Sequence, residues 1–472
     1  MYFREWTLEN MRLHVTLLNP PYPVGAHQHA PFISLGLLYL AAVLRENGYD
    51  VDVVDCQALG IWYDDVKREL ERRQPKIVGI TSTTLTYKPA LRIAKIAKRV
   101  CPNVLTILGG CHVTFWDREA LHECPEADVI VRKEGEITLL EIAKKVEEGN
   151  SFQDVLGITY RKNREIVRTP DRPYIENLDD LPFPAHDLLP IERLRKTGGL
   201  IFPVITSRGC IFWCDFCTAV RMFGRKYRTR SPKNIADELE LLENSHSAEE
   251  VAFCDDLFTL DQTRIRKLCR EIKERKLKIK WTCGTRVDMV AKDLLRVMKE
   301  AGCIGVWFGV ESGSQRLLEE MHKGISVAQT VKVFKWAREI ELRTLAQVII
   351  GFPGEDEKTA WKTIRLVEKI SPDEVGFYNV ATPFPGTPLY DQVVKNGWLR
   401  VTDFEKYDTT KPIFETPLLS MREIEKIREL AFLRFYIRPT YILRTFAKGW
   451  RQGFSASKAA LYHLLKAIMA SF

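Results

Sequence analysis

The sequence predicts an α/β protein, in which a doubly wound parallel sheet (a Rossmann-like domain) precedes a partial (β/α)6 barrel and a helical C-terminal tail. Over residues 12–148, short apolar runs alternate with helix-length amphipathic segments. Strand–helix alternation of this kind indicates a parallel sheet. The alternation resumes over residues 201–380, after a proline-rich segment, and its six apolar runs predict the six strands of an incomplete barrel.

The first sheet is expected to contain five strands and five helices. The strands are the apolar runs Leu13–Leu18, Asp50–Val54, Lys76–Ile80, Val104–Leu108 and Asp128–Val131. The helices are the amphipathic segments Ser34–Asn47, Trp62–Arg73, Lys88–Val100, Asp117–Cys124 and Glu136–Glu148. Gly48 ends the first of these helices, and Pro75 and Pro102 separate helix from strand.

A hairpin and a linker are expected between the two sheets. Gly157–Tyr160 and Glu165–Arg168 predict the hairpin, and five prolines between residues 170 and 190 exclude a regular helix or a central strand. The barrel strands are expected at Pro203–Thr206, Glu250–Cys254, Lys280–Arg286, Ile304–Val310, Leu345–Gly351 and Glu374–Val380. Helices fall between them, including Ser231–Asn244, where Ser231 is a candidate N-cap before a proline. We therefore predict domains at 1–150, 151–195, 196–410 and 411–472.

Charge and cysteine usage narrow the class of protein. The 472 residues carry a net charge of +8 and include eleven cysteines, without a signal-peptide pattern at the start or a long apolar run. These features predict a cytoplasmic protein without a transmembrane helix. Seven of the net positive charges fall between Leu430 and Phe472, where no acidic residue occurs, so the rest of the chain is nearly neutral and nucleic acid is not an expected partner. The tail is either a packed helical cap with a solvated basic face or a segment that rests on an anionic membrane.

Three cysteines follow the first barrel strand. Cys210, Cys214 and Cys217 are spaced C-x3-C-x2-C on the loop after the apolar run Ile201–Ile205. Ligands bind at this end of the strands in parallel sheets and barrels. A structural zinc site usually needs four ligands in C-x2-C pairs, and no second pair follows. The spacing therefore favours a 4Fe–4S cluster with one iron that has no protein ligand.

The cysteine loop resembles that of the radical S-adenosylmethionine (radical SAM) family, in which an aromatic residue precedes the last cysteine, as Phe216 does here. The resemblance implies that the open iron binds the amino and carboxylate groups of SAM, and that an electron from the cluster cleaves SAM to methionine and a 5′-deoxyadenosyl radical. It also implies a reducing electron donor of the flavodoxin or ferredoxin type.

The ends of the later barrel strands resemble the SAM-binding positions of this family. By resemblance, Phe216 and Ile350 lie near adenine, Arg286 near the SAM carboxylate, and Glu311 near its amino group or ribose. Asp256 stands where many members have Gly-Gly-Glu, and capping of the next helix is the expected role of one of the adjacent pair Asp255-Asp256. The resemblance does not identify a residue that acts on the substrate.

The ligand edge of the first sheet offers glycines and hydroxyl groups. It carries Asn19-Pro20-Pro21, Ser82-Thr83, Gly109-Gly110-Cys111-His112 and Gly135-Glu136. The absence of G-x-G-x-x-G disfavours a nicotinamide dinucleotide, and a Gly-Gly turn is by itself also common in purely structural turns.

The whole arrangement, however, resembles the cobalamin-binding domain that precedes one large subclass of radical SAM enzymes. The resemblance implies cobalamin contacts at Ser82, Thr83, Gly109, Gly110, His112, Gly135 and Glu136. The D-x-H-x-x-G motif, which supplies a histidine to cobalt in many cobalamin proteins, is absent. We therefore expect no protein histidine on cobalt, and we interpret His112 as a hydrogen-bonding residue of a turn.

These motifs predict a cobalamin-dependent radical SAM enzyme that resembles the methylases and cyclases of tetrapyrrole and lipid biosynthesis. The resemblance implies methylation of an unactivated carbon of an apolar substrate, such as a lipid, an isoprenoid or a tetrapyrrole. Ring closure or other C–C bond formation without methyl transfer is the alternative within the family.

Two further alternatives come from other classes of protein. An RNA methylthiotransferase would need an N-terminal cluster, against which the scattered Cys56, Cys101, Cys111 and Cys124 argue. A zinc-binding module without catalysis would be distinguished by an iron and zinc count after anaerobic reconstitution.

Overall fold

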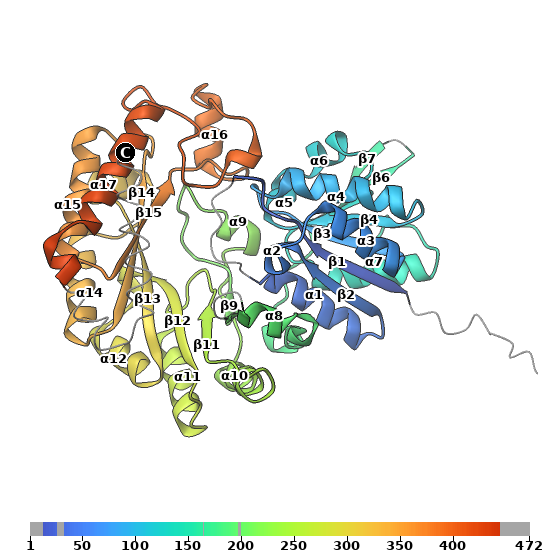
Figure 1. Ribbon diagram of the computed structural model, residues 1–472, viewed down its shortest axis with the longest axis horizontal. Coiled ribbons are helices and arrows are strands. Elements are labelled where there is room, and N and C mark those ends of the chain that lie inside the picture. Colours follow the sequence, from blue (N-terminus) through green and yellow to red (C-terminus); the bar gives the residue numbers. More distant parts are fainter. Residues whose placement is uncertain (1–12, 26–32, 164, 197–199, 444–472) are drawn as a thin grey trace, which may run out of the picture. The chain divides into compact units, whose positions relative to one another are not determined.

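The computed structural model describes residues 13–25, 33–163, 165–196 and 200–443. The chain forms two compact units (Figure 1). The first unit contains Met1–Ile211 and Thr218–Val251, and the second contains Phe212–Cys217 and Ala252–Phe472. The division passes through the cysteine loop, so Cys210 belongs to the first unit, and Cys214 and Cys217 belong to the second. The division into four domains drawn from the sequence stays a prediction.

The first unit is built on a seven-stranded sheet with the order β2-β1-β3-β4-β5-β6-β7. Its strands are β1 (His14–Asn19), β2 (Asp50–Asp55), β3 (Ile77–Thr81), β4 (Leu105–Gly109), β5 (Val129–Val131), β6 (Ile158–Lys162) and β7 (Glu165–Arg168). The first five are parallel, and the predicted hairpin adds β6 and β7 as antiparallel strands at one edge. The helices are α1 (Leu35–Glu46), α2 (Cys56–Leu59), α3 (Tyr63–Arg73), α4 (Tyr87–Val100), α5 (Cys111–Phe115), α6 (Asp117–Glu123) and α7 (Glu136–Glu147).

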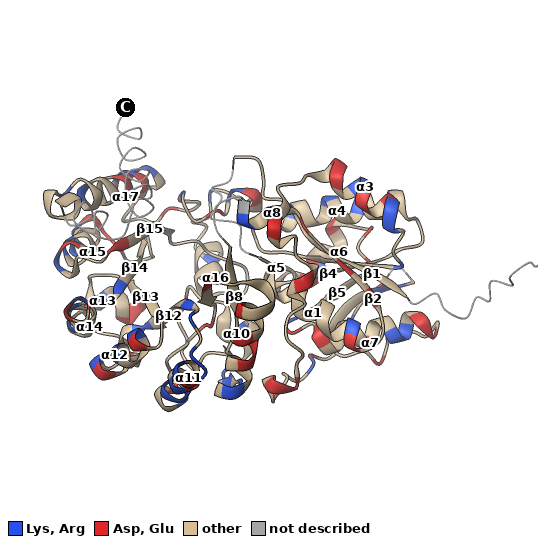
Figure 2. Cartoon of the chain, turned by 60° about the horizontal axis from the view of Figure 1, so that its bottom comes forward, with Lys and Arg blue, Asp and Glu red and all other residues tan. Residues whose placement is uncertain are grey.

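Apolar side chains hold α1 and α7 against this sheet. Leu37 and Leu44 of α1 and Ile142 of α7 share one buried cluster with Val15 and Ile107 of the sheet. Helix α1 packs beside α7, and α3 packs beside α4. Figure 2 shows both basic and acidic residues on α3 and α7, so neither helix carries charge of only one sign.

Smaller elements complete the first unit. They are the 3₁₀ turns Leu178–Asp180 and His186–Leu188, α8 (Ile191–Lys196), β8 (Ile201–Val204), β9 (Ser207–Arg208), α9 (Ala219–Phe223), β10 (Arg228–Thr229) and α10 (Pro232–His246). Ser231 caps α10 as predicted, because its hydroxyl accepts a hydrogen bond from the Asn234 N–H at 3.2 Å. The antiparallel pair β9–β10 was not predicted, since two-residue strands are too short to show a period.

A six-stranded sheet has the order β15-β14-β13-β12-β11-β8. Its remaining strands are β11 (Glu250–Phe253), β12 (Lys280–Arg286), β13 (Cys303–Glu311), β14 (Arg343–Ile350) and β15 (Glu374–Val380), with β12 to β15 parallel. The helices are α11 (Gln262–Glu274), α12 (Lys292–Glu300), α13 (Gln315–Glu320), α14 (Val327–Glu339), α15 (Glu357–Ile370), α16 (Pro388–Lys395) and α17 (Met421–Tyr436). The predicted fold class is thus confirmed: a parallel sheet at the N-terminus, a second parallel sheet and C-terminal helices.

The C-terminal helix packs on the second sheet. Ile424 of α17 is fully buried against Ile350 of β14 and Val380 of β15. Arg434 pairs with Glu368 at 2.8 Å, and Arg438 donates to the Glu368 carbonyl at 3.0 Å. The start of the basic tail therefore behaves as a packed cap, whereas residues 444–472 lie outside the described part of the chain. None of the helices in the described part has the length and apolarity needed to cross a membrane.

Candidate functional site

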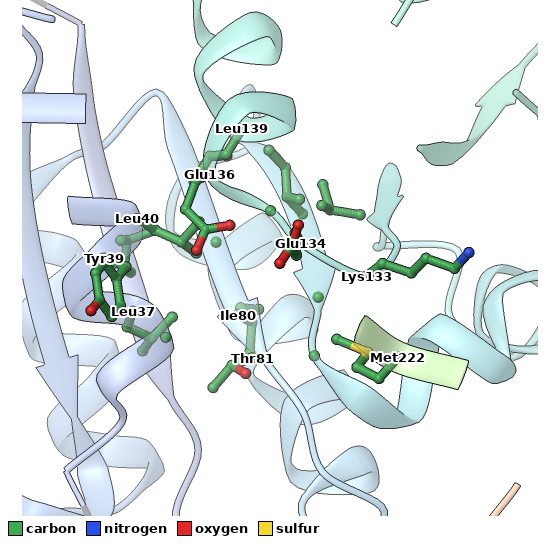
Figure 3. Close-up of a pocket in the computed structure, with 18 of the residues that line it drawn as sticks. Leu37, Tyr39, Leu40, Ile80, Thr81, Lys133, Glu134, Glu136, Leu139 and Met222 are labelled. Atoms are coloured by element: carbon green, nitrogen blue, oxygen red, sulfur yellow. The ribbon is translucent and has the colours of Figure 1, made fainter. Parts of the chain in front are cut away.

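A pocket opens at the carboxyl ends of β3, β4 and β5 in the first unit (Figure 3). It holds about 870 Å³ of empty space, open solvent at its mouth included. Its walls are mainly apolar, and they are formed by residues from the sheet, α1, α7, α9 and the segment between β8 and β9: Leu17, Leu37, Leu40, Ile80, Ile107, Val131, Leu139, Ile205, Met222 and Phe223. In Figure 3, Met222 lies across the pocket from Leu37 and Tyr39. This is the edge of a parallel sheet at which ligands bind.

Glycines let a ligand approach the backbone of this pocket. Gly110 has φ +99°, and a Cβ there would lie 2.5 Å from the carbonyl oxygen of Ser82. Gly135, which precedes α7, would bring a Cβ to 3.2 Å from Leu40. A side chain at Gly110 would therefore strain the backbone and displace the β3 loop.

The structure brings only some of the predicted cobalamin residues to the pocket. Gly109, Gly110, Gly135 and Glu136 are among its lining residues, whereas Ser82, Thr83 and His112 are not. The Ser82 hydroxyl donates to the Gly109 carbonyl at 3.1 Å, and Thr83 bonds with Thr86 at 3.1 Å. Ser82 and Thr83 thus hold the loops that shape the pocket.

His112 lies in α5 rather than in the predicted loop. Its ring is buried, with Nδ1 3.1 Å from the Thr84 hydroxyl and the ring centroid 4.3 Å from that of Tyr87. Burial lowers the pKa of His112 to about 3, so the ring is neutral at pH 7. The sequence predicts a loop here because the preceding Gly-Gly pair is typical of turns and a helix of five residues is too short to show a period.

Sequence reasoning missed an ion network at the pocket wall. Arg208 donates from Nη1 to Glu134 at 3.1 Å and from Nη2 to Glu136 at 2.6 Å, and all three side chains are buried. Burial opposes the charge of Arg208, but the Glu136 and Glu134 carboxylates outweigh it and hold the pKa of Arg208 above its ordinary value. Arg208 precedes Cys210 by two residues, but no signal in the sequence could name its partners, which lie 72 and 74 positions earlier.

In the second unit, register places Arg286 beside Gly309 and Gly309 beside Gln347. Paired residues of neighbouring strands point to the same face of a sheet, so these three share one face. Arg286 donates to both oxygens of Asp288, at 2.9 and 2.8 Å, and its guanidinium lies 3.5 Å from the ring centroid of Phe212. The buried Nη1 of Arg286 has no hydrogen-bond partner among the described residues.

Glu311 forms a buried ion pair beside this row. Its Oε1 lies 2.6 Å from Nζ of Lys323, which sequence reasoning missed, and this nitrogen lies 5.8 Å from the ring centroid of Phe216. Glu311 has φ +57°, and a Cβ on Gly309 would lie 2.5 Å from its carboxylate. Burial opposes the charge of Lys323, but the Glu311 carboxylate outweighs it and holds the pKa of Lys323 above its ordinary value. A strained backbone and a missing side chain thus make room for two opposite charges.

Ile350 and Asp256, the remaining residues predicted to bind SAM, do not lie with Arg286 and Glu311. Ile350 is fully buried with Val380 and Ile424, on the face of β14 that α17 covers. Because side chains alternate along a strand, Ile349 is the neighbour that shares the face of Gln347 and Arg286. Asp256 is exposed, whereas the adjacent Asp255 is buried.

Hydrogen bonds fix the cysteine loop within each unit. In the first unit, the Cys210 N–H donates to the Gly224 carbonyl at 3.2 Å. In the second, the Cys217 N–H donates to Cys214, and the Asp215 N–H donates to Met321, both at 3.1 Å. No three His, Cys, Asp or Glu side chains in the described part of the chain are grouped as a metal site. The cluster ligands therefore stay a prediction.

The fold and these sites define an α/β protein that combines an apolar pocket at the edge of its first parallel sheet with a three-cysteine loop after β8, the first strand of its second sheet. The B12 binding domain matches residues 23–143, and the radical SAM superfamily matches residues 204–367. An uncharacterised methyltransferase of Pyrococcus horikoshii is 37% identical over 410 residues, which cover 87% of this chain and 89% of that protein. The anaerobic magnesium-protoporphyrin IX monomethyl ester cyclase of Cereibacter sphaeroides is 30% identical over 437 residues, which cover 90% and 71%. The chain belongs to the family of cobalamin-dependent radical SAM methyltransferases and cyclases.

Other relatives agree with this assignment, and a solved structure shares the fold. A hopanoid C-3 methylase of Methylococcus capsulatus is 26% identical, and a bacteriochlorophyllide d C-12(1)-methyltransferase of Chlorobaculum tepidum is 25% identical. They cover 81% and 80% of this chain and 73% and 77% of their own. The fold matches that of the cobalamin-dependent SAM radical enzyme OxsB with a TM-score of 0.75 at 18% identity, over 97% of this chain and 71% of OxsB. The protein is an enzyme whose cofactors are cobalamin, a [4Fe–4S] cluster and SAM, and it needs a reductant and a substrate.

The residues present fit these cofactors. The pocket of the first unit offers apolar walls to a macrocycle, and backbone and charged groups to its amide side chains. The methionyl part of SAM is a zwitterion, and the second unit holds two pairs of opposite charge, the half-buried Arg286–Asp288 and the buried Lys323–Glu311. The Nη1 of Arg286 is a donor left for a carboxylate. Three thiols on one loop are the donor set of a [4Fe–4S] cluster with an open iron.

Proposed function

We propose that this enzyme methylates an unactivated carbon of an apolar substrate, and that the methyl group derives from SAM. When bound, the cofactors supply the methyl group and the radical chemistry that activates a C–H bond. Methyl transfer is supported by the relative that is 37% identical, whose name is that of a methyltransferase. The apolar character is supported by the hopanoid and bacteriochlorophyllide enzymes among the relatives.

One observation in the second unit carries the proposal of an apolar substrate. Trp307 is 38% exposed, although it lies within a central strand of the sheet. It is paired with Gly284, where an added Cβ would meet no atom within 4 Å, and with Leu345. Trp307 is two residues before Gly309 on the same face of β13. The indole ring and the open space at Gly284 therefore lie next to the cross-strand row of Arg286, Gly309 and Gln347. A planar or hydrocarbon substrate is the ligand that such a surface favours.

We assign the cofactor contacts as follows. Cys210, Cys214 and Cys217 hold the cluster, and the first-unit pocket holds cobalamin without a histidine on cobalt. Arg286 and Lys323 bind the carboxylate of SAM, and Glu311 accepts from its ammonium or ribose. Phe216 contacts adenine together with Ile349, which replaces Ile350 in this role because of the alternation along β14. Asp256 is kept as a candidate at the end of β11.

The experiment is a product assay with trideuteromethyl SAM. Anaerobically reconstituted enzyme with cobalamin and a chemical reductant is offered a hopanoid, a magnesium-protoporphyrin ester and, as a polar comparison, a cytidylyl phosphonate. We expect a trideuteromethyl group on one of the first two substrates, with the product identified by mass spectrometry. Labelling of the polar substrate alone would contradict the proposal.

The second candidate function is oxidative ring closure, which the cyclase relative at 30% identity favours. The same assay separates the two functions. A cyclase product gains no deuterium and loses hydrogen relative to its substrate, whereas a methylated product gains the labelled group.

We also propose a cytoplasmic enzyme that takes electrons from a flavodoxin- or ferredoxin-type donor and that contacts anionic lipid through its C-terminal end. The membrane contact is supported by the five basic residues between Arg444 and Phe472, where no acidic residue occurs. Each basic residue near an anionic surface contributes roughly 1 kcal/mol. We expect the intact chain to float with phosphatidylglycerol vesicles at low salt, and a chain that ends at Ile437 to stay in solution. Equal behaviour of both chains would refute the membrane contact.

A further inference from the structure

One arginine of the first unit takes part in two sites. Arg208 lies in β9, two residues before Cys210, and its side chain lines the pocket beside Glu134 and Glu136. The side chain is only 6% exposed, so it is part of the pocket wall and not a group of the rim. The cysteine loop and the pocket therefore share a residue.

The position of the Arg208 guanidinium is fixed on several sides. Its two outer nitrogens donate to two different carboxylates, at 3.1 Å to Glu134 and at 2.6 Å to Glu136. Arg228 also donates to both oxygens of Glu134, at 2.8 and 3.0 Å, and the ring centroid of Tyr39 lies 5.3 Å from Arg208. Because guanidinium is a planar fork, it cannot shift without losing one of these bonds.

The backbone that follows Arg208 is equally constrained. Arg208 pairs with Arg228 in the β9–β10 ladder. Gly209 has φ +91°, and a Cβ there would collide with the carbonyl oxygen of Lys226. The Cys210 N–H then donates to Gly224 at 3.2 Å. The side chain in the pocket wall and the backbone of the first cysteine thus belong to one rigid piece.

The pocket reaches the same piece through α7. Glu136 is the first residue of α7, and Gly135, which lines the pocket, lies between the two carboxylates that hold Arg208. A molecule that fills the pocket contacts Gly135 and the side chains on either side of it. Any shift of these residues moves the acceptors of Arg208.

We propose that Arg208 is a positioning residue that couples occupancy of the cobalamin pocket to the geometry of the cysteine loop. This inference rests on the proposed function, because it takes the pocket as the cobalamin site and the cysteines as the cluster site. Coupling between two sites is reciprocal. Cluster-loaded protein is therefore expected to bind cobalamin about tenfold more tightly than cluster-free protein, within the range that such couplings cover.

The test measures cobalamin affinity in both cluster states. Hydroxocobalamin is titrated into cluster-free and reconstituted protein, and binding is followed by the corrin absorption, without any turnover. The wild-type chain is compared with Arg208→Met and with Arg132→Met. Arg132 is a matched control, since it is 1% exposed and pairs with Asp171 at 2.8 Å but does not line the pocket.

We expect the tenfold ratio in the wild type and in Arg132→Met, and a ratio near one in Arg208→Met. An undiminished ratio in Arg208→Met, or equal affinities in both states of the wild type, overturns the inference while leaving the cobalamin site intact. Failure of every protein to bind hydroxocobalamin instead refutes the proposed function. Circular dichroism and thermal unfolding report whether Arg208→Met folds. If it does not, Glu136→Gln takes its place, because this change weakens the 2.6 Å bond and keeps the side-chain volume.

Discussion

Lys323 and Glu311 form an ion pair of 2.6 Å in which both side chains are buried. Removing one partner of a buried pair leaves the other charge without compensation, at a cost of roughly 3–5 kcal/mol. Such a pair is a poor source of net stability, because burial of both charges offsets most of their attraction. Because the pair lies beside Phe216 and Arg286, we propose that it serves a zwitterionic ligand, which exchanges partners with it.

Lys323→Met is therefore expected to weaken SAM binding at least tenfold and to lower the free energy of unfolding. The affinity falls because the SAM carboxylate loses a cation, and the stability falls because the buried Glu311 carboxylate loses its partner. Equilibrium dialysis with labelled SAM measures the first effect, and denaturant unfolding measures the second. Lys335→Met on α14 is the control, since Lys335 is 74% exposed and lies 4.0 Å from Glu339. Unchanged SAM affinity in Lys323→Met would exclude the assigned contact.

The buried carboxyl group of Glu355 is expected to make the stability of the protein depend on pH. Its side chain is fully buried after β14, with Oε2 accepting from the Gly351 N–H at 2.5 Å. Burial raises the pKa of Glu355 from 4.5 to about 8. Between these values the folded state holds a proton that the unfolded chain has released, so stability is greatest below about pH 4.5, falls as pH rises towards 8, and then levels off.

Glu355→Gln is expected to remove this part of the pH dependence. The amide still accepts from Gly351 and carries no charge that burial could penalise. The free energy of unfolding of the variant should exceed that of the wild type increasingly between pH 5 and pH 8, by roughly 1.4 kcal/mol per unit of pKa shift at most. Urea unfolding at four pH values measures it, with Glu357→Gln on the exposed start of α15 as the control. Parallel curves for wild type and Glu355→Gln would contradict the argument.

The three cysteines of the loop are expected to be needed for one cluster. Cys214→Ala should lose most of the iron and abolish reductive cleavage of SAM, because an open-iron cluster depends on three thiolates. Iron analysis and quantitation of 5′-deoxyadenosine measure both effects. Cys254→Ala, outside the motif, should keep them. Full 5′-deoxyadenosine formation by Cys214→Ala would end the assignment of this loop.

His112 is expected to leave cobalt untouched. The ring is buried against Tyr87, bonds to Thr84 and does not line the pocket. His112→Ala should therefore bind cobalamin with an unchanged absorption spectrum, although the protein becomes less stable by a few kcal/mol through the loss of buried contacts. A cobalt–histidine signature in the wild type that disappears in the variant would show the reverse.

The order of strands and helices and the type of chemistry could be predicted from the sequence, because both depend on local patterns. Apolar runs of four to seven residues marked the observed strands of both sheets to within two residues at most ends, as β12 and β15 illustrate. The spacing of Cys210, Cys214 and Cys217 indicated the cluster for the same reason, since its ligands lie within one short loop. The sequence did not predict β9, β10 and α5, because these elements are too short to show a hydrophobic pattern.

The sequence by itself determined which chemistries are present: a three-cysteine loop, a glycine-lined sheet edge and charged strand ends. Only the tertiary structure decided which charges pair. Arg208 meets Glu134 and Glu136, and Lys323 meets Glu311, because the folded backbone brings together side chains that lie apart in the sequence. It also decided that Ile349 and not Ile350 shares the face of Arg286, since a shift of one residue along a strand turns a side chain to the opposite side of the sheet.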